Sequence, residues 1–167
     1  MKFFSANIED LQTLYLDSLQ KALDMEQKIA KALPTMVENA SDPELSEAFS
    51  NHLEQTREHV SKVETLLRNA TGEANTTTCK VIGGLTAEAE DNIKDAKDPS
   101  IRDISLIASA QQIEHHEIAV YGTLRTWAEI LGRDWDAATL ESILTEEKEA
   151  DELLSGIADH VNLQQAA

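Results

Sequence analysis

Cysteine, proline and glycine are scarce in this chain, whose 167 residues include one cysteine, three prolines and six glycines. The lone cysteine, Cys79, excludes a disulfide within the chain and fits a reducing compartment such as the cytosol. Few residues that break helices favour long helices over strands. The length suits one domain that buries its own apolar core.

Basic residues are also few, because 14 lysines and arginines stand against 31 aspartates and glutamates, for a net charge of −17. A phosphate-binding surface needs clustered lysine and arginine, so we expect no nucleic-acid partner. An acidic surface attracts metal cations instead. No apolar stretch approaches the ~20 residues that span a membrane, and the first residues lack the apolar segment of a signal peptide. We therefore predict a cytoplasmic protein that does not enter a membrane.

Apolar residues recur at spacings of three and four along four long segments and one shorter segment, which is typical of amphipathic helices. The first helix is expected to begin at Ser5 or Asn7. The two short connections predict two antiparallel hairpins, and the long connection between the hairpins holds the short helix. This pattern predicts an all-α protein, a four-helix bundle with one long crossover. The predicted helices span residues 5–39, 44–69, 85–97, 101–131 and 136–161.

Four acidic residues lie inside the apolar stripes that should form the bundle core: Glu26, Glu114, Glu147 and Asp151. Glu117 lies at the margin of the same stripe as Glu114. A single glutamate of this kind is explained by a side chain that reaches solvent from the edge of a stripe. The central position recurs on three helices, however, and carboxylates that face each other in a core repel unless a cation lies between them. The pattern therefore favours a metal site.

Four segments around these carboxylates form a specific combination: residues 24–28 (DMEQK), 52–56 (HLEQT), 112–124 (QIEHHEIAVYGTL) and 146–151 (EEKEAD). Together they resemble the ferritin-like superfamily, and within it the YciF/YciE-like bacterial stress proteins, and the resemblance covers almost the whole chain. It implies a ferritin-like four-helix bundle with a carboxylate-bridged dinuclear iron or manganese centre, association into a homodimer and a role in the stress response.

The general pattern of dinuclear carboxylate bundles combines single glutamates on two helices with Glu-x-x-His on the other two, and this chain has no complete Glu-x-x-His. Glu147 is followed three residues later by Ala150 where the pattern has histidine, and Glu114 is followed by Glu117. Asp151 is a candidate to replace the ligand missing at Ala150.

The second predicted helix has no carboxylate at the centre of its stripe, and His52 and His59 lie at one edge. His59 is level with Glu26 and is a candidate nitrogen ligand, whereas His52 is expected about one turn away. For both histidines, a role in covering the edge of the core is an equally simple explanation.

The predicted ligand set has Glu114 or Glu147 as the bridge between two metal ions, Glu26, Glu117 and Asp151 as terminal ligands, and His59 as a nitrogen ligand. Such a site suits iron or manganese and predicts oxidase-type or peroxidase-type redox activity. The missing Glu-x-x-His pairs also allow a helical interaction protein that has lost its metal, so whether the chain is an enzyme stays open. An iron-storage cage is disfavoured, because the family that the chain resembles does not form cages.

Overall fold

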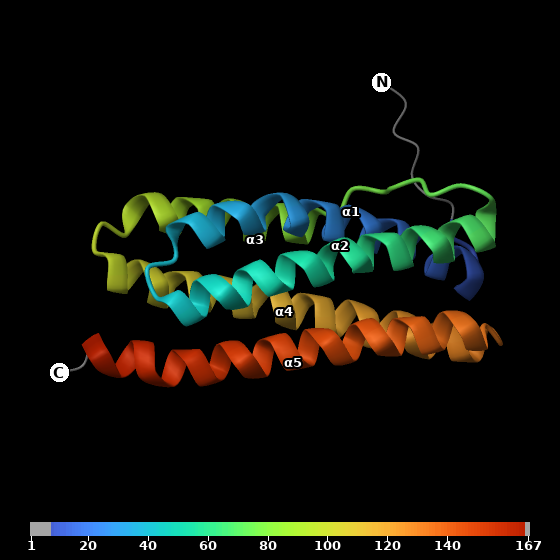
Figure 1. Ribbon diagram of the computed structural model, residues 1–167. Helices are drawn as coiled ribbons and strands as arrows, with labels where there is room; N and C mark the ends of the chain where they lie inside the picture. Colours follow the sequence, from blue (N-terminus) through green and yellow to red (C-terminus); the bar gives the residue numbers. More distant parts are fainter. Residues whose placement is uncertain (1–7, 166–167) are drawn as a thin grey trace, which may run out of the picture.

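The computed structural model describes residues 8–165, and within them the chain forms five α-helices and no strand. The helices run antiparallel to their neighbours in sequence along most of the molecule (Figure 1). They are α1 (Leu11–Asn39), α2 (Pro43–Thr71), α3 (Lys80–Asp95), α4 (Pro99–Ile130) and α5 (Asp134–Gln165).

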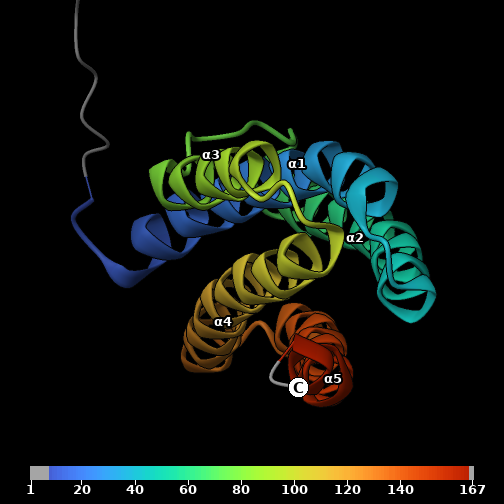
Figure 2. The same cartoon turned by 90° about the vertical axis from the view of Figure 1, so that its left-hand side faces the viewer.

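Helices α1 and α2 form one hairpin and α4 and α5 form the other, with α1 beside α4 and α2 beside α5. The short helix α3 belongs to the crossover and lies outside the four-helix core, against α1 and α4 (Figure 2). This arrangement confirms the predicted all-α bundle of two hairpins with an extra helix in the long connection.

Aspartate side chains begin three of the helices. Asp10 accepts a hydrogen bond from the backbone N–H of Thr13, and Asp42 and Asp98 accept hydrogen bonds in the first turns of α2 and α4. Pro43 and Pro99 occupy first-turn positions, where no N–H is needed. These caps explain why α2 and α4 begin directly after short polar connections.

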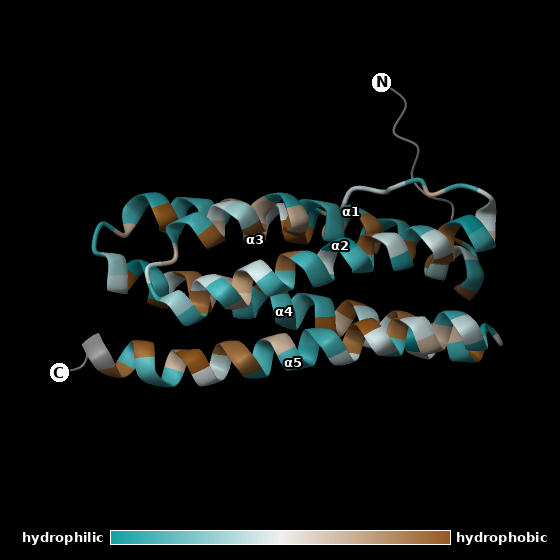
Figure 3. Ribbon diagram, viewed as in Figure 1, coloured by the Kyte–Doolittle hydropathy of each residue, from teal (hydrophilic) through white to brown (hydrophobic). Residues whose placement is uncertain are grey.

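The two hairpins are fastened to each other at both ends of the bundle. At one end, the buried Asp103 of α4 accepts hydrogen bonds from the backbone N–H groups of Ser41 and Asp42, at 2.8 and 2.9 Å. At the other end, the Tyr15 hydroxyl of α1 donates to Asp136 of α5 at 3.0 Å. Between these ends, each helix turns an apolar stripe inward, and hydrophilic and apolar residues alternate along every helix (Figure 3).

The first helix begins later than the sequence pattern suggested. Asp10 caps it, so α1 starts at Leu11, and Ile8 and Glu9 precede it without helical structure. The expected starting points Ser5 and Asn7 lie outside the described residues.

The short helix begins five residues earlier than predicted, at Lys80 instead of Leu85, and it contains Gly83 and Gly84. Glycine weakens a helix by about 1 kcal/mol relative to alanine, so two adjacent glycines disfavour a helix at this point in the sequence. The side chain of Ile82 is completely buried in the shared core. Burial of such a side chain is worth about 2 kcal/mol, which offsets the glycine penalty.

Candidate metal centre

Acidic and histidine side chains from all four long helices meet inside the bundle. Two groups of them could each hold a metal ion, because one ligand atom from each member lies within 4.8 Å of the others. Glu147 of α5 belongs to both groups. One group comprises His52, Glu114, Glu117 and Glu147, and the other comprises Glu26, His59 and Glu147.

The imidazole of His59 is held with one nitrogen facing the carboxylates. Its Nδ1 lies 2.9 Å from Oε1 of Glu147 and 3.8 Å from Oε2 of Glu26. Its Nε2 lies 2.6 Å from Oε2 of Glu146, whose other oxygen accepts a hydrogen bond from Lys62 at 2.9 Å. A histidine that binds a metal commonly has its second nitrogen fixed by a carboxylate in this way. Nδ1 is therefore positioned as a ligand atom.

His52 lies two turns before His59 on the same face of α2 and reaches the other group. Its Nε2 is 3.3 Å from Oε1 of Glu114 and 3.9 Å from Oε2 of Glu147. Across the centre, the Tyr121 hydroxyl donates a hydrogen bond to Oε1 of Glu26. Tyr121 thus orients the carboxylate of Glu26 and leaves its second oxygen free.

Most of the buried polar atoms that lack a hydrogen-bond partner are concentrated in this cluster. Among the described residues, ten of the eleven such side-chain atoms lie in or beside it, and the eleventh is Nε of Arg125. A buried polar atom without a partner is destabilising by about 1–3 kcal/mol. Nine of the ten belong to residues of the two groups, and the tenth is Oδ1 of Asp151, which lies beside them. The nine are Oε2 of Glu26, both nitrogens of His52, Nδ1 of His59, Oε2 of Glu114, both oxygens of Glu117 and both oxygens of Glu147.

The carboxylates raise one another's affinity for protons. Burial, together with the charge of Glu147, raises the pKa of Glu26 to about 8, although His59 and Tyr121 oppose the shift. Burial and the neighbouring carboxylates raise the pKa values of Glu114 and Glu117 well above the usual range. These shifts mean that negative charge accumulates at the centre only when positive charge compensates it.

The pKa of His59 is set mainly by neighbouring negative charges and not by burial. Burial alone lowers its pKa, but the close contact with Glu147 and the charges of Glu26 and Glu147 outweigh burial and raise the pKa to about 9. The centre therefore attracts positive charge, whether as protons or as metal ions.

The donor set fits two divalent cations. The four glutamates carry four negative charges when ionised, which two divalent ions neutralise, and the two histidines add one nitrogen to each group. Carboxylate oxygen combined with imidazole nitrogen suits iron and manganese. The position of Glu147 in both groups makes it the natural bridging ligand.

Five of the six residues predicted as ligands are brought together, and Asp151 is not. Asp151 lies outside both groups, with Oδ1 3.3 Å from Nδ1 of the exposed His115. Glu117, expected at the margin of its stripe, is completely buried in the centre. His52 was placed too far away by the sequence analysis, which compared its height with Glu26 alone. Its spacing of seven from His59, which puts both rings on one face of a helix, was the signal that could have identified it.

Comparison with known proteins identifies relatives of this chain in sequence and in fold. Residues 10–167 match the family described as a domain of unknown function, DUF892. Protein YciF of Escherichia coli (strain K12) is 33% identical over 153 residues, which cover 91% of this chain and 92% of that protein.

The chain belongs to the DUF892, YciF-like family. Two solved structures support the membership, each with a TM-score of 0.88 and covering 92% of this chain and 98% of the other. One is YcfI from Rhodopseudomonas palustris, at 37% identity, and the other is the Escherichia coli stress protein YciF, at 32%. A Xanthomonas campestris protein, at 22% identity and a TM-score of 0.72, shares the fold. None of the helices in residues 8–165 combines the length and apolar character that crossing a membrane requires.

Proposed function

We propose that this DUF892 protein binds two iron or manganese ions in the middle of its bundle and uses them in a stress-linked redox reaction. The observation that carries the proposal is the number and kind of candidate ligand residues in the cluster. The general pattern of dinuclear carboxylate bundles provides four glutamates and two histidines. Here the cluster provides the same number of each, with Glu147 common to the two groups.

Each residue has a role in the proposal that follows from its position. Glu147 would be shared by the two ions, Glu26 and His59 would hold one of them, and His52, Glu114 and Glu117 would hold the other. Outside this set, Tyr121 fixes Glu26, and Glu146 fixes His59. Because both outer contacts are hydrogen bonds to ligand residues, they hold the ligand atoms in place before any ion binds.

A pair of iron or manganese ions, when bound, supplies the electrons with which O₂ or peroxide is reduced. The surrounding residues exclude water from the centre and provide a hydrogen-bond donor to it. Leu19, Ile113 and Leu140 belong to the buried apolar core around the bundle centre. Tyr121, whose pKa is raised by burial and by the charge of Glu26, keeps its proton and remains a hydrogen-bond donor. The stress role comes from the relative in Escherichia coli, which is called a stress protein.

Elemental analysis by mass spectrometry of untagged protein, purified without chelator, tests the proposal. We expect about two iron or manganese ions per chain, either as purified or after anaerobic incubation with Fe(II). Glu147→Gln should lose most of the metal, because both groups share this carboxylate. Glu152→Gln, an exposed position on the same helix, is the matched control. Full metal content in Glu147→Gln, or none in the wild type after Fe(II) incubation, would overturn the assignment.

A metal-free interaction protein is the second candidate, and one observation favours it. His59 and Tyr121 already contact Glu147 and Glu26, so part of the buried charge is compensated without metal. In that case a chelator should leave the melting temperature unchanged. A metal that binds the folded state alone would instead raise the melting temperature by mass action, so the chelator would lower it.

A further inference from the structure

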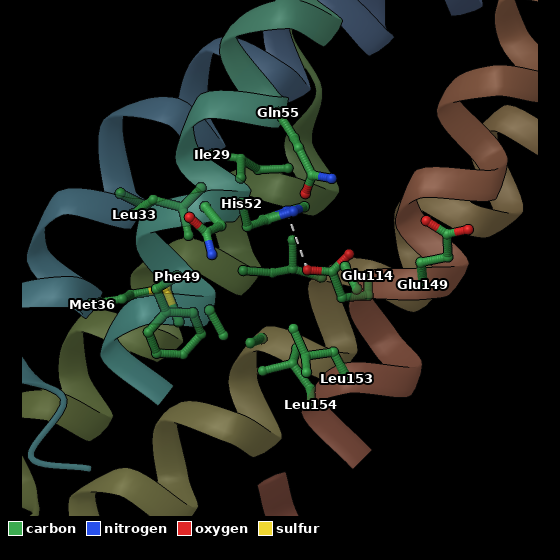
Figure 4. Close-up of a pocket in the computed structure, with 16 residues that line it drawn as sticks. Ile29, Leu33, Met36, Phe49, His52, Gln55, Glu114, Glu149, Leu153 and Leu154 are labelled. Carbon is green, nitrogen blue, oxygen red and sulfur yellow. Dashed lines mark ion pairs between the residues drawn. The ribbon is translucent and has the colours of Figure 1, made fainter. Parts of the chain in front are cut away.

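An apolar cavity of about 300 Å³ lies beside the candidate metal centre, between α1, α2, α4 and α5 (Figure 4). Its walls include Ile29, Leu33, Phe49 and Leu154, and they bring apolar side chains from three helices to one space. Exposed residues, among them Glu149, line its outer part, so the cavity is reachable from solvent.

The inner part of the cavity is polar. His52 and Glu114 line it, and they are only 7% and 3% exposed. The dashed line in Figure 4 joins them across the cavity from α2 and α4. Both ring nitrogens of His52 and Oε2 of Glu114 are buried without a hydrogen-bond partner. Each side chain has two ligand atoms, so one atom of each can bind a metal ion while the other faces the cavity.

We propose that this cavity binds a small uncharged organic molecule with an apolar body and a hydroxyl group, that is, an aliphatic alcohol or a phenol. The apolar walls select the body, and a cavity of about 150 Å³ is already large enough for benzene. A hydroxyl group both donates and accepts, so it can bond to an imidazole nitrogen and a carboxylate oxygen together. A carboxylate ligand is disfavoured because it would enter beside buried glutamates in a chain of net charge −17.

A small residue keeps this cavity open. Ala150 lines it, and this is the position, three residues after Glu147, where the general pattern of dinuclear bundles has histidine. An imidazole there would occupy part of the space that the alanine leaves. The inference deepens the proposed function and rests on it for the role of the molecule as a substrate, since it places an organic molecule next to the metal ligands.

Calorimetric titration with 1-hexanol, 1-octanol and octanoate tests the inference, on the protein as purified and after removal of metal. We expect saturable binding of one alcohol per chain, with about fourfold higher affinity for each added methylene until the cavity is full. Octanoate should bind at least tenfold more weakly than 1-octanol. Ala150→Leu and Ala32→Leu, which fill the cavity from α5 and α1, should each weaken alcohol binding at least tenfold. Ala30→Leu is the matched control, because Ala30 is also half-buried on α1 and does not line the cavity.

Two results would overturn the inference: absence of saturable alcohol binding, or equal affinity in the filled variants and the Ala30→Leu control. Octanoate binding as tight as 1-octanol would overturn the assigned ligand class. Urea unfolding of each variant verifies that it is folded, and two variants on different helices guard against a local defect. Metal content is measured on the same samples. A wild type that binds alcohol but takes up no metal, even after incubation with Fe(II), would contradict only the proposed metal function. A wild type that takes up metal but binds no alcohol would contradict only the inference about the cavity.

Discussion

Replacement of Glu117 by glutamine should affect the stability of the metal-bound protein and of the metal-free protein differently. Glu117 is completely buried, neither of its oxygens has a hydrogen-bond partner, and its group includes Glu114 and Glu147 within 4.8 Å. Two unit charges at that distance repel by about 3.5 kcal/mol at an effective dielectric constant of about 20. Burial and this repulsion raise the pKa of Glu117 well above its usual range, so they favour its protonated form in the metal-free protein.

The substitution should accordingly have opposite consequences in the two forms. A neutral glutamic acid and a glutamine have nearly the same shape, so we expect the metal-free variant to unfold within about 1 kcal/mol of the wild type. With metal, the variant lacks one negatively charged ligand. Loss of a mere outer contact reduces metal affinity 10–100-fold, so loss of a ligand should reduce it by about 100-fold or more.

Thermal unfolding followed by circular dichroism measures both effects. At a free Mn(II) concentration about 100 times the dissociation constant, the wild type should gain about 2.7 kcal/mol, and the variant at the same concentration about 0.4 kcal/mol. For a chain of this size the gain corresponds to a melting temperature about 5–11 °C higher for the wild type and about 1–2 °C higher for Glu117→Gln. Glu152→Gln, on an exposed position, should behave as the wild type does. Equal stabilisation of Glu117→Gln and wild type by Mn(II), or severe destabilisation of the metal-free variant, would refute the reasoning.

Three further predictions concern pH, the link between the hairpins and assembly. Burial raises the pKa of Glu26 from the usual 4.5 to about 8, so the metal-free fold binds this proton more tightly than the unfolded chain does. The unfolding free energy of the metal-free protein should therefore fall as the pH rises from about 4.5 to about 8. Urea unfolding should show a shallower fall for Glu26→Gln, and an identical fall would contradict the assignment. Asp103→Ala leaves the N–H groups of Ser41 and Asp42 without their acceptor. It should lower the unfolding free energy by about 2 kcal/mol in the same urea assay, whereas Asp159→Ala, at an exposed position, should change it little. Size-exclusion chromatography with light scattering should give the mass of two chains, as the family resemblance implies, and a single-chain mass would exclude the homodimer.

The arrangement of the helices was predictable because the amphipathic pattern is strong and local. Asp42-Pro43 and Asp98-Pro99 each place the cap beside the first helical residue, which fixes where α2 and α4 begin. The short connections before α2 and, at Gly132, before α5 then give the two hairpins. The start of α3 was not predictable in this way. Gly83 and Gly84 weaken a helix locally, and the contact that outweighs them, the burial of Ile82, exists only after the crossover packs against the bundle.

The carboxylates of the centre were predictable for a related reason, since charge at the middle of an apolar stripe is anomalous in any helix. Histidine at the edge of a stripe is not anomalous, so His52 carried no comparable signal. Asp151 failed for a geometric reason. It follows Glu147 by four residues, and this places it on the stripe, but its side chain meets His115 at the surface of α4 instead of the other carboxylates. Helical periodicity gives the direction of a side chain to about a quarter of a turn, which is too coarse to decide between these two positions.

The absence of Glu-x-x-His pairs in the sequence suggested a decayed site, but the arrangement in space supports a different interpretation. The four glutamates and two histidines of the general pattern are present, and α2 supplies both histidines while α4 supplies two of the glutamates. With the nitrogen ligands on α2, α5 needs no histidine after Glu147, and Ala150 can line a cavity there. The missing histidine after Glu147 and the apolar cavity then have one cause. With the imidazole ligands on α2, the position of Ala150 on α5 is left with space beside the candidate ligands. On the proposed function, a centre rearranged in this way would combine binding of metal with room for an organic molecule. A centre that had simply decayed would have no reason to retain nine unpartnered atoms of its two candidate ligand groups in the core.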